Sequence, residues 1–215
     1  MVKRRRIGRG CGCLLAGVAV LVIVAVVLAV QAFASPDLGP PPGGADDGET
    51  QLAIAARLGG SLAGQLLAGE HGHVDLSEHD LTVLVREHDP EPTRFQSPDV
   101  RVRGNLVVIA ARTPLGPFSF VAVARMALAR SEDAGGPRVS ATFTSTQVGN
   151  LGLPDQVTSA LQDHVQQAFD LQDLLSADPV LSLARQALEC VRVGDGVVRL
   201  GFHRPGAAED TAACG

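Results

Sequence analysis

The side chains that could bind a metal ion are concentrated in one short stretch of the sequence. Neutral imidazoles held around a tetrahedral centre bind zinc, and His71, His73 and His79 could supply three of them. Their spacing matches no established zinc pattern, and Gly72 leaves the first pair flexible. We therefore predict no metal ion and no other cofactor. The stretch holds four of the six histidines among its acids: Glu70, His71, His73, Asp75, Glu78, His79, Asp80, His88 and Asp89.

Motifs for hydrolysis and nucleotide binding are absent from the sequence. A serine hydrolase with a nucleophile elbow would carry G-x-S-x-G, whereas Ser61 follows Gly59 and Gly60 inside a helical pattern. There is no phosphate loop, no H-E-x-x-H and no dinucleotide fingerprint. Acids brought together from distant strands could form a catalytic site without a local motif. With no such pair indicated, we predict that the protein is not an enzyme.

A long apolar segment near the N-terminus organises the chain. Cys13–Val30 is 18 consecutive residues without a charged or strongly polar side chain, and Ala32, Phe33 and Ala34 continue the apolar character. As a helix, residues 13–34 would extend about 33 Å, enough to cross a hydrocarbon core of about 30 Å. We therefore predict a transmembrane helix over residues 13–34.

Charges around this segment predict its orientation. Five basic residues and no acidic ones precede residue 35, so residues 1–12 are expected to be a cytoplasmic tail and the remainder extracytoplasmic. Residues 32–34 also form an A-x-A cleavage site, so a signal peptide cleaved after Ala34 is the alternative. The apolar core is longer than the usual signal-peptide core of about 7–15 residues. This length favours a retained, single-pass anchor in the cell membrane.

The exported part is acidic. It carries 13 basic and 23 acidic residues, a formal charge of −10. Such a surface argues against nucleic acid and against electrostatic adhesion to anionic lipid. Any contact with lipid must therefore be apolar, and the sequence identifies no protein partner.

The four cysteines divide between the two sides of the predicted membrane. Cys11 and Cys13 lie at the cytoplasmic edge of the span, where they are either acylated or simply small residues at a helix end. Cys190 and Cys214 lie in the exported part, in an oxidising compartment. A disulfide between them that holds the C-terminal tail is therefore expected as one alternative to two free thiols.

Residues 35–49 are rich in Pro, Gly and Asp and predict a linker that holds the domain off the bilayer. The domain is expected over residues 50–204 and a polar tail over residues 205–215. Leu52, Ala55, Leu58, Leu62 and Leu66 recur at helical spacing, and further helices are expected at the following places: from Ser77, with Asp80 at its third position, to Asp89; over residues 154–170; and over residues 178–188.

Alternating apolar residues predict the strands of an antiparallel sheet. Val100 and Val102 precede a Gly104-Asn105 turn, and a strand over residues 106–111 follows. A strand from Phe118 to Arg130 is apolar on both faces and should be covered on both. Strands over residues 139–144, 190–193 and 197–203 complete the set. The predicted class is α+β: an N-terminal transmembrane helix followed by an extracytoplasmic domain of curved antiparallel sheet packed with two to four helices.

Three stretches resemble the YpmS-like group of bacterial membrane-anchored proteins: VDLSEHDLTVLV at residues 74–85, VGNLGLP at 148–154 and VRVGDGVVRLGF at 191–202. The resemblance implies an acid-capped helix, a curved sheet, a glycine-leucine-proline turn, a helix and a closing hairpin. That group is similar in style to LmeA-like lipid-binding proteins, in which a long helix on a curled sheet leaves an apolar groove. Because this chain has no Trp or Tyr and only seven Phe, a groove here would be aliphatic.

The resulting hypothesis is an envelope module that binds lipid or another apolar ligand. A non-enzymatic interaction or scaffold protein of the envelope is the alternative, because the Pro/Gly-rich linker would give the domain reach. Large apolar side chains on faces that should meet are the candidate ligand contacts, although such stripes also form ordinary cores. These candidates are Leu81, Phe118, Phe120, Phe143, Leu161 and Phe169.

Overall fold

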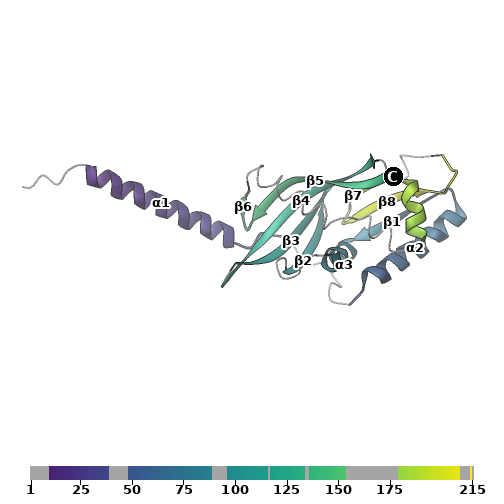
Figure 1. The fold of residues 1–215 in the computed structure, drawn as a ribbon, viewed down its shortest axis with the longest axis horizontal. Helices are drawn as coiled ribbons and strands as arrows, with labels where there is room; N and C mark the ends of the chain where they lie inside the picture. The colour runs from purple at the N-terminus through teal and green to yellow at the C-terminus, as the bar shows by residue number, and fades with distance from the viewer. Residues whose placement is uncertain are drawn as a thin grey trace, which may run out of the picture.

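Two antiparallel sheets form the body of the domain (Figure 1). The computed structural model describes residues 10–38, 48–88, 96–115, 117–133, 136–153, 179–208 and 214, with side chains from residue 20 onward. The larger sheet has the order β2 (Gln96–Arg103), β3 (Leu106–Leu115), β4 (Phe118–Asp133), β5 (Gly136–Val148), β6 (Leu151–Gly152). The smaller sheet has the order β1 (His71–Ser77), β8 (Val197–His203), β7 (Leu188–Gly194).

Helices lie at both ends of this body. Figure 1 shows α1 extending away from the β6 end of the larger sheet, whereas α2 lies at the opposite end of the domain. The expected α+β class is therefore shown, with two antiparallel sheets in place of one. The helix expected over residues 154–170, with Leu161 and Phe169, lies outside the described residues. The described helices are α1 (Gly10–Phe33), α2 (Gln51–Ala68), α3 (Glu78–His88) and α6 (Pro179–Ala184), the last followed by a 3-10 turn (Arg185–Ala187).

A single main core joins the two sheets and the helices. It draws buried side chains from α2, α3, α6 and seven of the strands, so neither sheet has a separate core on this side. Burying this apolar surface is the dominant force that holds the elements together. The largest fully buried apolar side chains are Phe202, Ile54, Leu62, Leu76, Leu81, Met126, Leu181, Leu188 and Leu200.

Helix α2 packs on β1 through a position without a side chain. Thr50 caps the helix by accepting a hydrogen bond from the Ala53 amide at 3.3 Å. A Cβ at Gly72 would come within 2.9 Å of Leu62 Cδ1, so glycine allows the close approach of helix and strand. The buried stripe begins at Ile54 instead of the expected Leu52, which is 66% exposed. Gly72 is therefore a packing residue of a strand that the sequence patterns did not predict.

Helix α3 begins as the sequence predicts. Asp80 accepts hydrogen bonds from the Ser77 amide at 2.9 Å and the Ser77 hydroxyl at 2.8 Å, and the Asp80 amide donates to Ser77 Oγ at 3.2 Å. This reciprocal pair satisfies free groups at the start of the helix. Asp80, which is buried, also pairs with Arg57 of α2. The predicted cap is confirmed, and its acid additionally joins two helices.

Strand β4 contributes to buried clusters on both faces of the larger sheet, as its sequence predicts. Met126 and Leu128 belong to the main core. Val123 belongs to a second cluster with Val108 and Ala110. The predicted strand end at Arg130 was too early, because β4 continues to Asp133 and β5 begins at Gly136. Backbone pairing of Ser131 with Arg138 and of Asp133 with Gly136 continues the two strands beyond that point.

An ion pair between Asp75 and Arg199 links β1 to β8. These residues are register partners, and Arg199 donates two hydrogen bonds to the Asp75 carboxylate, Nε to Oδ1 at 2.7 Å and Nη2 to Oδ2 at 2.8 Å. The hydrogen bond from Arg199 is the main reason that the pKa of Asp75 lies below its usual value of 3.8, and burial opposes it. Both side chains are about one-third exposed, at 36% and 35%, so solvent limits the strength of the pair.

Replacing Asp75 with asparagine should therefore produce a small, pH-dependent loss of stability. A lowered carboxyl pKa contributes stability that is present above the unfolded-state pKa and lost as pH falls through the folded-state value. We expect D75N to lower the free energy of unfolding by at most about 1 kcal/mol at neutral pH. In urea titrations followed by circular dichroism, the difference from the wild type should shrink towards zero below about pH 3. A difference that stays constant with pH would contradict this account.

Candidate functional site

The α1 end of the larger sheet carries the most exposed apolar surface that the structure describes. The large apolar side chains of α1 between Val20 and Val30 are 43–69% exposed, and Phe33 is 47% exposed. Soluble surfaces rarely present so many large apolar side chains in succession. Within the part of the chain whose side chains are described, no helix is long and apolar enough to cross a membrane.

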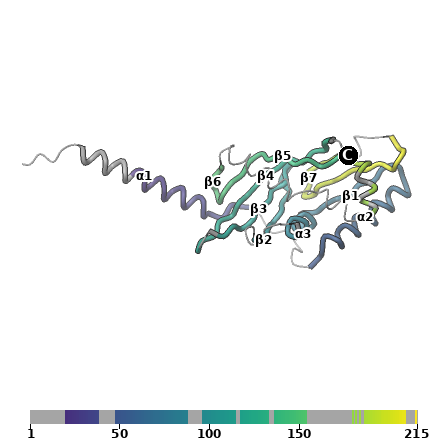
Figure 2. Tube along the Cα trace, viewed as in Figure 1, coloured from purple at the N-terminus to yellow at the C-terminus, as the bar shows by residue number. Residues whose placement is uncertain are grey.

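The C-terminal end of α1 is joined to the sheet by backbone contacts. The Asn150 amide donates to the Gln31 carbonyl at 2.8 Å, and the Gly149 amide donates to the Val121 carbonyl at 2.7 Å. Figure 2 follows α1 into this end of the sheet, beside β6. Gly149 has a φ of +58°, and a Cβ there would collide with the carbonyl groups of Gln31 and Ala32. Only glycine fits the turn between β5 and β6 while α1 is in place.

We expect Gly149→Ala to separate α1 from the sheet without unfolding the core. The collision must displace either the turn or the end of α1, and both movements break the hydrogen bond from Asn150. Amide hydrogen exchange of the full chain should show the Asn150 amide exchanging about 10-fold faster or more, since losing a bond of about 1.4 kcal/mol corresponds to a factor of 10. The Leu200 amide, in the centre of β8, should keep its protection.

A matched control separates the effect of the steric collision from the cost of placing alanine at a positive φ. Gly104 has the same φ of +58°, but a Cβ there would meet nothing within 4 Å. Gly104→Ala therefore carries only the conformational cost of about 1 kcal/mol. If both variants left Asn150 equally protected, the contact between α1 and the turn would not be significant in solution.

Residues 35–38 also lie against the sheet. Leu38 packs on the second cluster formed by Val108, Ala110 and Val123, together with Val121. Arg103 Nη2 donates to the Leu38 carbonyl at 2.8 Å. These residues begin the linker that is expected over residues 35–49. Its first four residues keep the sheet beside the end of α1, and residues 39–47 lie outside the described part of the chain.

An exposed aromatic side chain from the β3–β4 hairpin meets α1 at the same place. Phe118 is 63% exposed. Its ring centroid lies 5.6 Å from that of Phe33, with an angle of 50° between the planes. Aromatic pairs commonly adopt such tilted contacts at centroid separations of about 4.5–7 Å. Two segments 85 positions apart in the sequence thus form one exposed aromatic surface.

The nominated ligand contacts do not gather in one groove. Leu81 is fully buried in the main core, and Phe143 is partly buried against that core. Phe118 and Phe120 lie near the tip of the β3–β4 hairpin, whereas Phe143 is the register partner of Met126. Six residues along β4 separate Phe120 from that position, about 20 Å at the usual rise of a strand. Leu161 and Phe169 lie outside the described residues.

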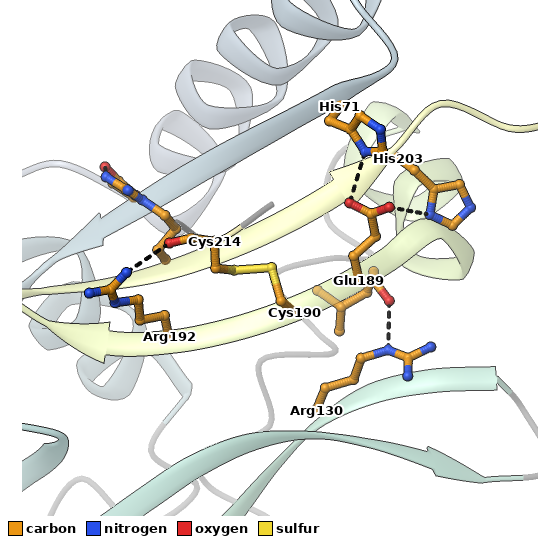
Figure 3. The surroundings of a disulfide bond; sticks show 10 residues. His71, Arg130, Glu189, Cys190, Arg192, His203 and Cys214 are labelled. Atoms are coloured by element: carbon orange, nitrogen blue, oxygen red, sulfur yellow. Dashed lines mark hydrogen bonds and ion pairs between the residues drawn. A yellow bond between two sulfur atoms is a disulfide. The ribbon is translucent and has the colours of Figure 1, made fainter. Parts of the chain in front are cut away.

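A buried carboxylate crosses the smaller sheet at the other end of the domain (Figure 3). Glu189 of β7 is only 3% exposed. Its Oε2 lies 3.1 Å from His71 Nδ1 of β1, and its Oε1 lies 3.5 Å from His203 Nδ1 of β8. Because a buried carboxylate requires polar partners, the cluster ties all three strands together. The immediate role of this cluster is structural. No motif in the sequence indicated that Glu189 would meet the two histidines.

The three histidines that were considered as zinc ligands lie on different elements. His71 and His73 lie on β1, whereas His79 lies on α3 and contacts Glu49 Oε2 at 3.3 Å. Among the described residues, no group of three or more His, Cys, Asp or Glu side chains is arranged to hold a metal ion.

A disulfide joins Cys190 of β7 to Cys214, beside the buried carboxylate (Figure 3). Cys214 is 6% exposed, and its carbonyl accepts a hydrogen bond from Arg192 Nη1 at 3.3 Å. On the other side of Glu189, Arg130 Nε of β4 donates to the Leu188 carbonyl at 2.8 Å and links the two sheets. Cys214 is thus fixed to the smaller sheet.

A second buried ionic group lies between α3 and β2. Arg101 is 2% exposed, and its guanidinium lies 2.7 Å from Asp99 Oδ2 and 3.6 Å from Glu78 Oε2. Burial raises the pKa of Asp99 above its usual value, although Arg101 acts in the opposite direction. Glu78 also accepts a hydrogen bond from the Val102 amide at 2.8 Å. These contacts fix α3 on the edge strand of the larger sheet.

Sequence patterns contained a signal for the aromatic surface. Residues 113–124 carry no charge over 12 positions, which is unusual for a hairpin tip on so acidic a domain. The hydropathy of the hairpin alone could not show that Phe118 lies beside Phe33. Comparison with protein-family models, curated proteins and solved structures yields no significant match for this chain.

Proposed function

We propose that this chain is a single-pass, membrane-anchored module of the bacterial cell envelope, whose extracytoplasmic domain binds lipid or another apolar ligand. The observation that carries the proposal is the succession of outward-facing apolar side chains along α1, which is joined directly to the larger sheet. Such a surface is stable when lipid covers it. The sequence supports the same interpretation, because Cys13–Val30, 18 residues without a charged or strongly polar side chain, follows a basic N-terminus.

Two further features support an extracytoplasmic location for the domain. Disulfides persist in oxidising compartments outside the cytoplasm, and Cys190 and Cys214 form one. The likeness of residues 74–85, 148–154 and 191–202 to the YpmS-like group points in the same direction. The acidic charge of the domain gives no electrostatic attraction to anionic lipid, so attachment rests on apolar contacts.

The retained anchor can be tested separately from ligand binding. Intact-mass measurement of protein extracted from membranes should give the mass of a chain that keeps residues 13–34. The protein should also resist alkaline extraction, as an integral membrane protein does. A mature chain that begins at Ser35 would show that the segment is a cleaved signal peptide and would overturn the anchor.

Ligand binding calls for a measurement that locates the lipid on the chain. Cells fed a photoreactive fatty acid are irradiated, and crosslinked peptides of the full chain are mapped by mass spectrometry. We expect crosslinks in residues 13–34, and a second set in the domain. Crosslinks in residues 13–34 alone would retain the anchor but remove lipid binding by the domain. A separate protein–protein crosslinking experiment in cells that traps one reproducible partner would favour the interaction or scaffold role.

A further inference from the structure

The tip of the β3–β4 hairpin is the only described strand connection that touches the end of α1 through an aromatic ring. We call residues 113–115 and 117–120 the hairpin tip. We propose that the hairpin tip enters the interfacial layer of the bilayer that α1 crosses, so that the domain contacts the membrane at a second point. This inference rests on the proposed anchor. It identifies a surface that binds the bilayer itself, in addition to any ligand within the domain.

The position of Phe33 fixes the depth of the hairpin tip. Phe33 lies three residues beyond Val30, the last residue of the stretch without charged or strongly polar side chains, a displacement of about 4.5 Å along a helix. That displacement places Phe33 at the boundary between the acyl chains and the headgroups. Phe118 contacts Phe33 with ring centroids 5.6 Å apart. Phe118 must therefore occupy the same layer whenever α1 spans the bilayer in this arrangement.

The chemistry of the hairpin tip suits that layer. Phe118 is 63% exposed, and Pro114 and Pro117 beside it are also exposed. No charged residue occurs between Thr113 and Ala124, so inserting the tip buries no ionic group. Aromatic side chains are enriched at membrane interfaces, and apolar faces bury about 5–10 Å into the headgroup boundary.

The first charged residue of the hairpin lies at a suitable distance from its tip. Arg112 is exposed and precedes Leu115 by three strand residues, about 10 Å at the usual rise of a strand. With the tip in the interface, Arg112 would lie near the lipid phosphates, where a long cationic side chain is favourable. The hairpin thus combines an apolar tip with a basic residue at the level where the charge is tolerated.

Several observations favour a bilayer over a protein as the occupant. The exposed aromatic surface is continuous with the exposed side chains of α1, through the contact between Phe33 and Phe118. The hydrogen bonds from the Asn150 amide to the Gln31 carbonyl and from the Arg103 guanidinium to the Leu38 carbonyl hold the sheet beside the helix end. A protein partner bound here would have to displace lipid that already surrounds α1.

The chain is well suited to a fluorescence test because it contains no tryptophan and no tyrosine. Three single-tryptophan variants of the full chain, Phe33→Trp, Phe118→Trp and Leu67→Trp, are reconstituted into vesicles of phosphatidylcholine and phosphatidylglycerol. Matched vesicles contain phosphatidylcholine brominated near the glycerol end of its acyl chains. Leu67 is 87% exposed on α2, at the end of the domain opposite α1. A tryptophan at position 67 therefore measures quenching by lipid that does not require insertion into the bilayer.

We expect the brominated lipid to quench the tryptophan at position 118 by roughly two-fold, because that ring would lie within the 5–10 Å interfacial layer. The tryptophan at position 33 should be quenched at least as strongly, and that at position 67 should not change. Quenching at position 33 without quenching at position 118 would overturn the hairpin contact and leave the anchor intact. Absence of quenching at both positions would overturn the anchor, and equal quenching at all three would show non-specific adsorption and overturn the inference.

Discussion

Replacement of Phe202 with alanine is expected to lower the free energy of unfolding by about 4 kcal/mol, since deleting a buried phenylalanine ring costs about 3–5 kcal/mol. Phe202 lies on the central strand of the smaller sheet and is fully buried. Its register partners are Gly72 of β1 and Leu188 of β7. Truncation leaves a cavity that these fixed strands cannot close, and the loss approaches the whole stability of a marginal domain.

The measurement is urea unfolding of the full chain in mild detergent, followed by circular dichroism, because the chain lacks Trp and Tyr. Phe118→Ala is the matched control: it makes the same change at a side chain that is 63% exposed. Surface substitutions of this kind usually change stability by at most about 0.5 kcal/mol. If the free energy of unfolding fell by a similar amount in both variants, Phe202 would not be the core residue that the structure places there. A stable F118A protein would also show that the hairpin tip is not needed for folding.

Removal of the disulfide should have the second-largest effect. Replacing both Cys190 and Cys214 with serine is expected to lower the free energy of unfolding by about 3 kcal/mol, the value for a loop of this order of length. The bond joins residues 24 positions apart, and it fixes a buried residue near the C-terminus to the smaller sheet. Without it, the unfolded chain gains conformational entropy and the tail loses its attachment.

A reductant provides the control for this effect. Dithiothreitol should destabilise the wild-type protein by about as much as the double substitution, and it should leave the stability of the double variant unchanged. Cys11 and Cys13 are present in both proteins, so their reduction cannot account for a difference. A wild-type protein whose stability is insensitive to reductant would contradict a stabilising role for the bond.

Prediction from the sequence worked best where one local pattern decided the structure. Ser77 and Asp80 predicted the start of α3, because a capping pair forms between residues three apart. The Gly104-Asn105 turn connects β2 and β3 as expected. The two apolar faces of β4 also followed from its alternation of large side chains.

Prediction failed where pairing with distant segments outweighed local composition. Residues 131–133 and 136–138 lie beyond the predicted strand end at Arg130, but backbone pairing between β4 and β5 extends the sheet through them. Residues 71–77 were considered only as a source of metal ligands, because of their histidines, and no strand was predicted there. Their alternation of Gly72, Val74 and Leu76 on the buried face instead makes them an edge strand that pairs with β8.

The sequence was sufficient to predict an apolar N-terminal segment with a basic flank, an acidic α+β domain, and several helix starts and turns. These properties depend on composition and on residues within a few positions of each other. Three features could be found only from the tertiary structure. They are the contact of Phe33 with Phe118, the steric conflict that allows only glycine at position 149, and the burial of Glu189 between two histidines. Each joins residues that lie 14 to 118 positions apart in the chain, and only the packing of the two sheets and α1 determines which of them meet.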